Sequence, residues 1–251
     1  DLGPKERVNF IQPDAASLAI NRIIGSQGSS ILGNINANGQ VWLINPNGVM
    51  FGKNAQVDVG SLVATTLDTP ITVNLTGYQT FSGNSNAAVT NNGLLNAANG
   101  GYVALLGHRV SNQGSIKATS GTVAMAAGST VDLQFSANKL LAVQVYESLL
   151  NAVSENGGLI SADAGQVFLK AGGQASLLRS AVNNTGVIQA RTVQKLGGKI
   201  VLHSGMKAGV TSVDGKLDGS VADTGDGGFI ETSGQTVQVA DKADINTHSA
   251  S

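Results

Sequence analysis

The sequence contains no cysteine, which excludes disulfide bonds, zinc–thiolate sites and cysteine nucleophiles. Charged residues make up only 12% of the 251 residues, about half the share that is usual in globular domains. The 15 basic and 16 acidic residues nearly cancel, so a strong electrostatic attraction to nucleic acid or to an anionic membrane is excluded. No run of about 18 apolar residues occurs, and the sequence therefore predicts no membrane-spanning helix.

Proline and aromatic residues are also scarce, with 4 Pro, 6 Phe, 3 Tyr and 1 Trp, whereas 33 Gly and 22 Asn are present. This composition is typical of a chain with many tight turns. The hydrophobic content of 41% suffices for a core, so residues 1–251 are expected to form a single domain. Asp1, Leu2 and Gly3 provide neither an initiator methionine nor an apolar leader, and we expect a processed or trimmed segment.

Two short phrases recur along the chain, and internal repeats of this kind decide the fold class. In the first phrase Asn and Gly precede an apolar-x-Ala segment, and its copies begin at Asn92, Asn112, Asn156 and Asn184. The second phrase is Gly-x-Val-x-Leu, and its copies begin at Gly39, Gly101, Gly121, Gly165, Gly198 and, more loosely, Gly228. The spacing from Val103 to Val123 is 20 residues, and from Val123 to Val167 it is 44, which fits two coils or one coil with an insertion.

Each repeat consists of short strands joined by Gly/Asn turns, and such a unit cannot bury its inner face alone, so the units must stack. We therefore predict an all-β fold, a right-handed parallel β-helix (solenoid). The leucine-rich repeat has a similar period, but its L-x-x-L-x-L phrase is missing. The apolar positions of the second phrase are predicted to form the core: Val41, Leu43, Val103, Leu105, Val123, Met125, Val167, Leu169, Ile200 and Leu202.

The segments that interrupt the repeats are predicted to decorate the solenoid. Residues 66–90 are predicted to form an extra-helical β-hairpin of strands 70–75 and 78–81, with Tyr78 and Phe81 packed against the helix. Residues 131–135 and 141–145 are expected to form a second strand pair. Residues 147–153 and 175–182 have the pattern of short helices. The inserted strand pair and the first helix would thus occupy residues of about 130–153.

Candidate metal-binding residues do not converge in the sequence. His108, His203 and His248 are far apart and lack a carboxylate at ligand spacing, so neither a metal site nor a cofactor is predicted. Six aspartates between residues 214 and 244 could bind calcium weakly, but a solvated acidic loop is the favoured interpretation. Asn74 and Asn183 begin N-glycosylation sequons of the kind that an Asn-rich chain contains by chance.

An enzymatic alternative is a β-helical polysaccharide lyase or hydrolase, or a carbohydrate-binding module. Such an enzyme needs carboxylates clustered on one face together with basic residues or calcium. A Gly-x-Ser-x-Gly nucleophile motif is absent. The chain has only four glutamates, Glu6, Glu147, Glu155 and Glu231. The sequence therefore favours a protein without enzymatic activity.

The most specific stretch is the turn formed by Asn45, Pro46, Asn47 and Gly48. Asn suits the first position of a type I turn, Pro presets the backbone of the second, Asn tolerates the third and Gly suits the fourth. Two interpretations stay open. The turn either only stabilises one corner of a coil, or it nucleates folding and thereby serves a further function.

This turn and its surroundings resemble the secretion domain of two-partner secretion exoproteins. That family of Gram-negative bacteria includes the filamentous haemagglutinins, the high-molecular-weight adhesins and the haemopexin-binding exoproteins. The segments that carry the resemblance, besides the turn, are residues 10–13, 21–23, 31–35, 38–44, 55–60, 62–66 and 103–107. The N-terminal cap strands of that family are expected to precede residue 1. A second Asn-Pro-Asn-Leu motif is absent, so the chain is more similar to the high-molecular-weight adhesins.

The resemblance implies an N-terminal secretion module. Members of the family cross the inner membrane by the Sec route, and a TpsB-type outer-membrane β-barrel transporter with polypeptide-transport-associated domains recognises them in the periplasm. It further implies a secreted or cell-surface location and a downstream part that binds a host or cell-surface receptor or a polysaccharide. On this resemblance, Asn45, Pro46, Asn47 and Gly48 are the secretion motif, and the module nucleates β-helix folding at the cell surface.

Overall fold

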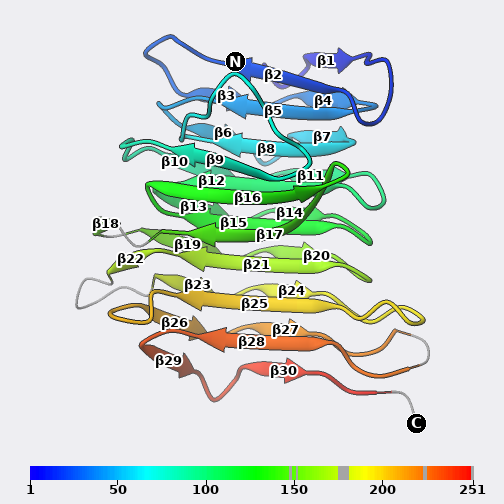
Figure 1. Ribbon diagram of the computed structural model, residues 1–251, viewed down its shortest axis with the longest axis vertical. Helices are drawn as coiled ribbons and strands as arrows, with labels where there is room; N and C mark the ends of the chain where they lie inside the picture. The colour runs from blue at the N-terminus through cyan, green and yellow to red at the C-terminus, as the bar shows by residue number, and fades with distance from the viewer. Residues whose placement is uncertain (147–148, 151, 175–180, 223–224, 250–251) are drawn as a thin grey trace.

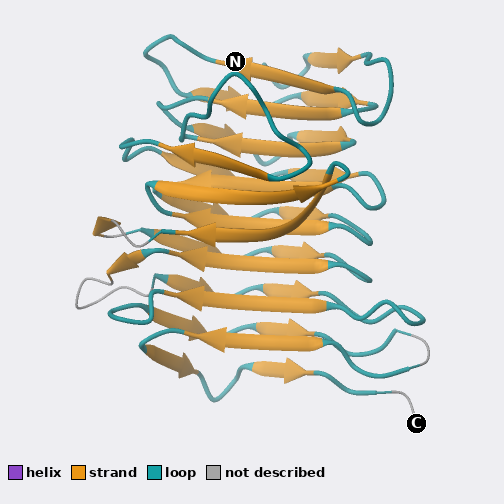
Figure 2. Ribbon diagram, viewed as in Figure 1, coloured by secondary structure: helices purple, strands orange, loops and turns teal. Residues whose placement is uncertain are grey.

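The computed structural model describes residues 1–146, 149–150, 152–174, 181–222 and 225–249. These residues form strands, turns and loops, and no helix occurs among them (Figure 2). The part of the chain that the structure describes therefore contains no helix that could span a membrane. Three parallel sheets contain most of the strands.

The three sheets run the length of the molecule. Sheet 1 consists of β2 (Leu18–Arg22), β5 (Gln40–Ile44), β8 (Ser61–Thr65), β12 (Tyr102–Gly107), β15 (Thr122–Ala127), β21 (Gln166–Ala171), β25 (Lys199–Ser204) and β28 (Phe229–Ser233). Sheet 2 consists of β3 (Ser29–Ile31), β6 (Val49–Phe51), β10 (Ala88–Asn91), β13 (Arg109–Asn112), β19 (Val153–Asn156), β23 (Val182–Asn184), β26 (Val210–Val213) and β29 (Thr236–Val239). Sheet 3 consists of β1 (Arg7–Phe10), β4 (Asn34–Ala37), β7 (Gln56–Val59), β11 (Leu94–Ala97), β14 (Ser115–Lys117), β20 (Leu159–Ser161), β24 (Val187–Gln189), β27 (Lys216–Asp218) and β30 (Asp244–Asn246).

Each coil visits the three sheets in the order 1, 2, 3, and each strand pairs in parallel with its counterparts in the neighbouring coils. In Figure 1, sheet 1 faces the viewer with its strands running from right to left, and the chain returns from left to right behind it. The chain descends from the N-terminus at the top to the C-terminus at the bottom, so the coil is right-handed. The predicted right-handed parallel β-helix is confirmed.

The interior of the helix is apolar, as the repeats predicted. All ten predicted core side chains are buried, none more than 7% exposed. Strands of sheets 2 and 3 alternate buried and more exposed residues, because only one of their faces meets the core. In contrast, β5, β8, β12 and β15 of sheet 1 are buried at every position. Their outer face must therefore be covered as well.

A three-stranded antiparallel sheet, the cover sheet, lies on the outer face of sheet 1. Its strands are β17 (Lys139–Val145), β16 (Thr130–Ser136) and β9 (Tyr78–Ser82), in that order. Strands β16 and β17 confirm the predicted strand pair. Between the two sheets lies an aromatic cluster in which the Trp42 ring centroid is 5.3 Å from that of Phe81 and 6.3 Å from that of Phe135. Trp42 Nε1 also donates to the Tyr102 hydroxyl at 3.0 Å, and burial raises the pKa of Tyr102.

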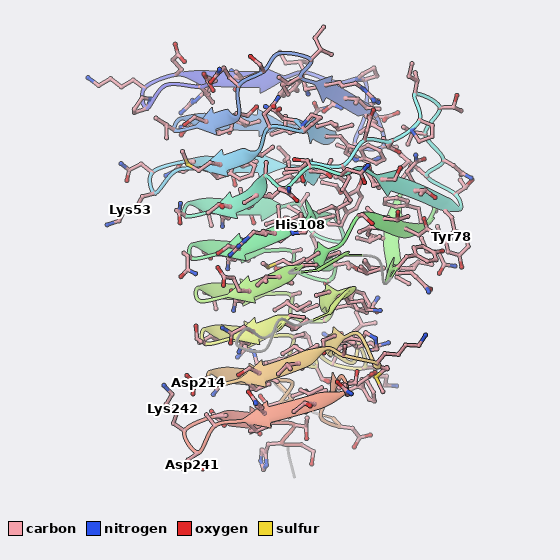
Figure 3. All side chains as sticks on the ribbon, turned by 90° about the vertical axis from the view of Figure 1, so that its left-hand side faces the viewer. Lys53, Tyr78, His108, Asp214, Asp241 and Lys242 are labelled. Carbon is pink, nitrogen blue, oxygen red and sulfur yellow. The ribbon has the colours of Figure 1, made fainter. Side chains whose placement is uncertain are left out.

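The predicted hairpin over residues 66–90 is wrong. Residues 70–75 form no strand, β9 pairs with β16 instead, and residues 88–90 belong to β10. Phe81 is fully buried as predicted, but Tyr78 is 62% exposed on the outer side of the cover sheet (Figure 3). The alternation of β9 explains both outcomes, because Gln79 and Phe81 face sheet 1 and the intervening residues face solvent.

The predicted helix over residues 147–153 is also wrong where the structure describes it. Leu149–Leu150 form β18, which pairs in parallel with β22 (Gly173–Gln174), and Val153 begins β19. Residues 175–180 of the second predicted helix lie outside the described residues, and Val182 begins β23. Pairing with strands of adjacent coils overrides the weak local helical preference at these positions.

The first repeat phrase forms a ladder of buried asparagines at the corner between sheets 2 and 3. The side-chain amide of Asn91 donates to Asn112 Oδ1 at 2.8 Å, that of Asn112 to Asn156 at 2.7 Å, and that of Asn156 to Asn184 at 2.8 Å. The first copy is therefore in register at Asn91, not at Asn92 as the sequence pattern indicated. Burial of an amide requires such partners, so each ladder residue fixes the register of its coil.

The glycines of both phrases occupy corners where successive coils approach each other closely. A Cβ atom on Gly158 would lie 2.1 Å from the carbonyl oxygen of Gly114, and one on Gly121 would lie 1.9 Å from that of Gly101. Any larger residue would push the coils apart at these positions. The glycine content of the chain thus follows from coil stacking.

We expect Val167→Asp to lower the free energy of unfolding by about 3 to 5 kcal/mol, because it buries an unpaired charge in the core. Ser161→Asp, on the outer face of β20, is the control and should change it by about 0.5 kcal/mol or less. Urea unfolding of both variants measures the difference. Equal effects would contradict the assignment of Val167 to the interior.

We expect amide hydrogen exchange to be slow over residues 78–82, because β9 is paired with β16 and covered on one face. Exchange should be fast at residues 71–73, whose amides have no acceptor among the described residues. Residue-resolved exchange by NMR or mass spectrometry distinguishes the two segments. Rapid exchange throughout residues 70–82 would show that β9 does not pack stably.

Candidate functional site at the 45–48 turn

The 45–48 turn joins β5 of sheet 1 to β6 of sheet 2. The amide of Gly48 donates to the carbonyl oxygen of Asn45 at 3.0 Å, which closes the predicted four-residue turn. Asn45 Oδ1 accepts the amide of Asn47 at 2.9 Å, a local side-chain bond typical of Asn in turns. Gly48 has φ +112°, a conformation that side chains larger than glycine rarely adopt. The turn residues therefore match their backbone positions.

The two asparagine side chains bind the turn to the preceding coil. Asn45 is fully buried, and its Nδ2 donates to the carbonyl oxygen of Gln27 at 3.0 Å and to Ser29 Oγ at 2.8 Å. Asn47 Nδ2 donates to the carbonyl oxygen of Gly25 at 2.7 Å. The segment between β2 and β3 is thus held by side chains of the turn. These bonds give the turn a structural role that a four-residue turn alone does not have.

The turn also contacts the following coil. Ser85 Oγ donates to the carbonyl oxygen of Pro46, and a Cβ atom on Gly48 would approach the carbonyl oxygen of Ala88 to 3.3 Å. Three successive coils therefore meet at this corner. A substitution that distorts the turn would therefore alter its contacts with both the preceding and the following coil.

The outward part of the corner differs from its buried part. Pro46 and Asn47 are exposed, and Ile24, which precedes the Gly25 contact of Asn47, is 94% exposed. The exposed side chains of Pro46 and Ile24 belong to two segments that the Asn47–Gly25 bond joins, and they offer apolar surface that a partner protein can contact. Asn45 serves the fold, whereas these three side chains are available to a partner.

The three histidines do not form a metal site within the part of the chain that the structure describes. The described residues contain no group of three or more His, Asp or Glu that could hold a metal ion. His108 is buried between β12 and β13, where burial and the neighbouring Arg109 lower its pKa, and His203 Nδ1 lies 2.9 Å from Ser233 Oγ. His248 is exposed near the end of the chain.

The aspartates between residues 214 and 244 are partly engaged by lysines. Asp214 forms an ion pair with Lys242 at 3.0 Å (Figure 3). Asp244 forms one with Lys216 at 3.0 Å. Asp218 lies 3.8 Å from the same lysine. Asp223 lies outside the described residues. The pairing with lysines agrees with the favoured interpretation of a solvated acidic segment.

Comparison with known proteins assigns this architecture to a family. A model of the TPS secretion domain matches residues 1–221. Two relatives from Haemophilus influenzae, both named heme/hemopexin-binding protein, are 35% and 32% identical over 217 and 224 residues. Each alignment covers 80% of this chain but only 23% and 24% of the relative, so the chain spans about a quarter of their length.

A solved structure has the same fold. The crystal structure of the HMW1 secretion domain from Haemophilus influenzae is similar with a TM-score of 0.70 and 26% sequence identity. The match covers 97% of this chain and 73% of that chain. The structural similarity therefore includes nearly the whole chain.

We expect Asn45→Ala to lower the free energy of unfolding by about 3 kcal/mol, because several bonds to buried partners are lost. Asn47→Ala should cost about 1 kcal/mol, since its side chain is exposed and makes fewer bonds. Urea unfolding of the two variants gives the comparison. If Asn47→Ala proved as costly as Asn45→Ala, the buried side chain would not be the one that holds the coils.

Proposed function

The chain belongs to the TPS secretion domain family, and on that premise we propose that an outer-membrane transporter recognises it in the periplasm and exports the exoprotein that carries it. The expected transporter is a TpsB-type β-barrel with polypeptide-transport-associated domains. The family match over residues 1–221 supports this partner. The final location is proposed to be the bacterial cell surface or the medium.

The observation that carries the proposal is the division of the 45–48 turn into a buried and an exposed part. Asn45 links coils inside the corner, while Pro46, Asn47 and Ile24 are exposed on it. A transporter can contact the exposed side chains without unfolding the corner. The same turn therefore supports folding through Asn45 and recognition through its neighbours.

We also propose that the domain nucleates folding of the exoprotein outside the cell. Coils stack on their neighbours, so a completed coil is a template for the next. The proline and the asparagine bonds lower the entropy cost of closing an early coil. Stable folding of the first coils also depends on the outer face of sheet 1. Trp42 on that face stays exposed to solvent until residues 130–145 emerge and form the cover sheet. The folding nucleus thus includes the cover sheet as well as the first coils.

We propose that the main adhesive or ligand-binding activity of the exoprotein lies in residues outside this chain. The relatives named heme/hemopexin-binding protein are about four times as long as the part that matches. The enzymatic alternative has less support, since the described residues contain no cluster of three or more His, Asp or Glu side chains. We propose that the chain has no catalytic activity.

The test is a secretion assay of the full exoprotein in cells with and without the transporter. Pro46→Ala combined with Asn47→Ala is expected to reduce secretion by about tenfold, because about 1.4 kcal/mol of recognition energy is lost at the exposed corner. Ser85→Ala is the matched control, since it removes a contact to the turn without changing the exposed side chains.

The purified domain with the same substitutions is expected to lose about 1 to 2 kcal/mol of unfolding free energy, because Asn47 and Pro46 both contribute to the turn, and it must stay folded under the conditions of the assay. Normal secretion of the double variant would overturn recognition at this corner. A loss of secretion that only follows the loss of stability, and is therefore larger for Asn45→Ala, would assign the turn to folding alone.

A further inference from the structure

Two cavities lie along the free edge of β17, between the cover sheet and the outer face of sheet 1. The first, of about 340 Å³, lies where β17, β21 and β25 begin and is lined by Lys139, Gln166 and Lys199, among others. The second, of about 170 Å³, lies where the same strands end and is lined by Gln144, Lys170 and His203, among others. We call these two cavities, one at each end of β17, the β17 trough. Strand β17 has seven residues, so the two cavities lie about 20 Å apart.

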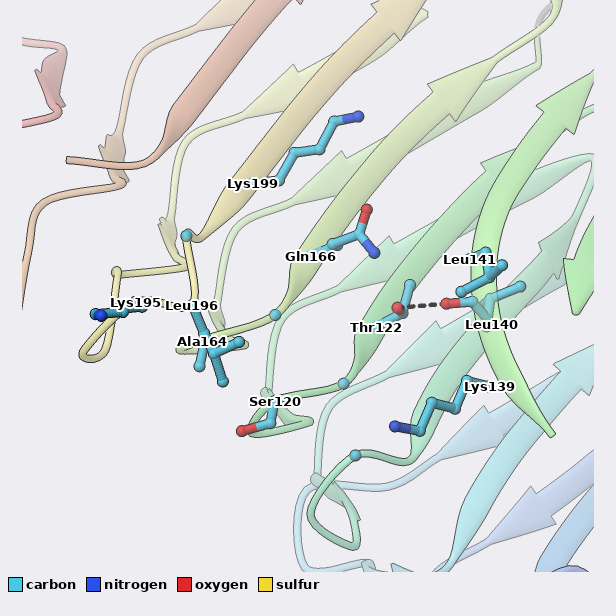
Figure 4. A pocket seen from close by; sticks show the side chains of 14 residues that line it. Ser120, Thr122, Lys139, Leu140, Leu141, Ala164, Gln166, Lys195, Leu196 and Lys199 are labelled. Atoms are coloured by element: carbon cyan, nitrogen blue, oxygen red, sulfur yellow. Dashed lines mark hydrogen bonds between the residues drawn. The ribbon is translucent and has the colours of Figure 1, made fainter. Parts of the chain in front are cut away.

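The lining of the trough is basic. Lys139, Lys195 and Lys199 contribute to the lining of the first cavity, with Lys139 directed into it and the ammonium end of Lys195 directed away from it (Figure 4), and Lys170 and His203 line the second. No carboxylate lines either cavity in the described part of the chain. The whole chain has a formal net charge of −1, so this concentration of positive charge is local.

The first cavity is lined by charged, polar and apolar side chains. Figure 4 shows Lys139 reaching from β17 toward Ser120, with Ala164 and Leu196 across the cavity and Lys199 beside Gln166. Leu141 and Leu196 are 42% and 60% exposed and provide apolar walls. Lys199 lies over the rings of Phe168 and Phe229, with Nζ 5.8 and 5.7 Å from their centroids. The cavity therefore combines fixed positive charge with apolar surface.

The backbone of β17 disfavours an added peptide strand. Its carbonyl oxygens at Leu140 and Val143 already accept bonds from Thr122 Oγ1 at 2.7 Å and from Lys170 Nζ at 2.8 Å. Strand addition needs free backbone donors and acceptors along the edge. A basic side chain directed at the edge is also a known means of preventing such pairing. The ligand must bind through its charges and not through a peptide backbone.

We propose that the β17 trough binds an acidic polysaccharide, a chain of sugars that carry carboxylates. Its carboxylates would pair with Lys139, Lys195 and Lys199 at one end and with Lys170 and His203 at the other. Sugar rings present C–H faces to the two leucines and hydroxyl groups to Ser120 and Gln166. This function goes beyond export, because it gives the secretion domain itself an affinity for acidic surface glycans.

The test measures binding of a fluorescently labelled oligogalacturonate to the 251-residue chain by fluorescence anisotropy in about 0.1 M salt, where the screening length is about 10 Å. Lys139→Gln combined with Lys195→Gln is expected to raise the Kd by roughly tenfold or more, as loss of charge-assisted hydrogen bonds implies. The control combines Lys5→Gln with Lys53→Gln, which removes the same charge elsewhere. Both control residues are exposed, and Lys53 lies on the opposite side of the molecule from the cover sheet (Figure 3). The control should leave the Kd within about twofold of the original, since distant exposed charges are screened.

Both altered lysines of the trough are exposed, so the variant is expected to fold, and its thermal melting curve checks this. Polyglutamate of matched charge should bind at least about tenfold more weakly than the oligogalacturonate, because it lacks the sugar rings and hydroxyl groups that would contact the two leucines, Ser120 and Gln166. Absence of binding, equal weakening by the control pair, or tighter binding of polyglutamate would each overturn the proposal. The first two outcomes leave recognition by the transporter untouched, since neither involves the 45–48 turn.

Discussion

The central strands of sheet 1, β5, β8, β12 and β15, are buried on both faces, and most of the architecture depends on this requirement. The inner face of sheet 1 supplies one wall of the helix core, while its outer face carries Trp42, Tyr102 and Leu106, all fully buried. A solenoid of bare coils would leave that outer face in water, at a cost of about 25 cal/mol per Å² of apolar area. The insertions that provide β9, β16 and β17 remove this cost. These insertions interrupt the repeat, because the repeated strands alone leave the outer face of sheet 1 uncovered.

The corners impose the second constraint. Neighbouring strands of a sheet lie about 4.8 Å apart, so coils can stack only where corner residues permit that approach. Glycine permits it sterically, and the buried asparagine ladder provides the hydrogen bonds that hold the register. The 45–48 turn meets the same need differently, with Asn45 bonded to the backbone and side chain of the preceding coil. Its proline and second asparagine thereby stay exposed.

The sequence predicted the features that depend on repeated local patterns, and it did not predict those that depend on contacts between residues far apart in the chain. Repeated positions such as Val103 and Val123 carry the period, so the helix and its core were predictable from local patterns. The pairing of β9 with β16 was not, because it joins residues far apart in sequence that share no repeat. The register of the asparagine ladder was uncertain at its first copy, because Asn91 and Asn92 are adjacent in sequence and either could begin the first repeat phrase. The trough was not predicted, because Lys139 is far from Lys195 and Lys199 in sequence. It lines the same cavity as they do only because β17 lies over sheet 1.

A domain that must complete its own cover before it is stable can finish folding only once residues 130–145 are available to pair as β16 and β17. Trp42 is the only tryptophan and is buried beneath the cover sheet, so its fluorescence reports when the cover docks. The most direct measurement is stopped-flow refolding of the whole chain, followed by Trp42 fluorescence and by far-ultraviolet circular dichroism. We expect both signals to recover with one rate constant, because the first coils and the cover sheet form together. Strand formation that is complete before a separate, slower change in Trp42 fluorescence would contradict this mechanism.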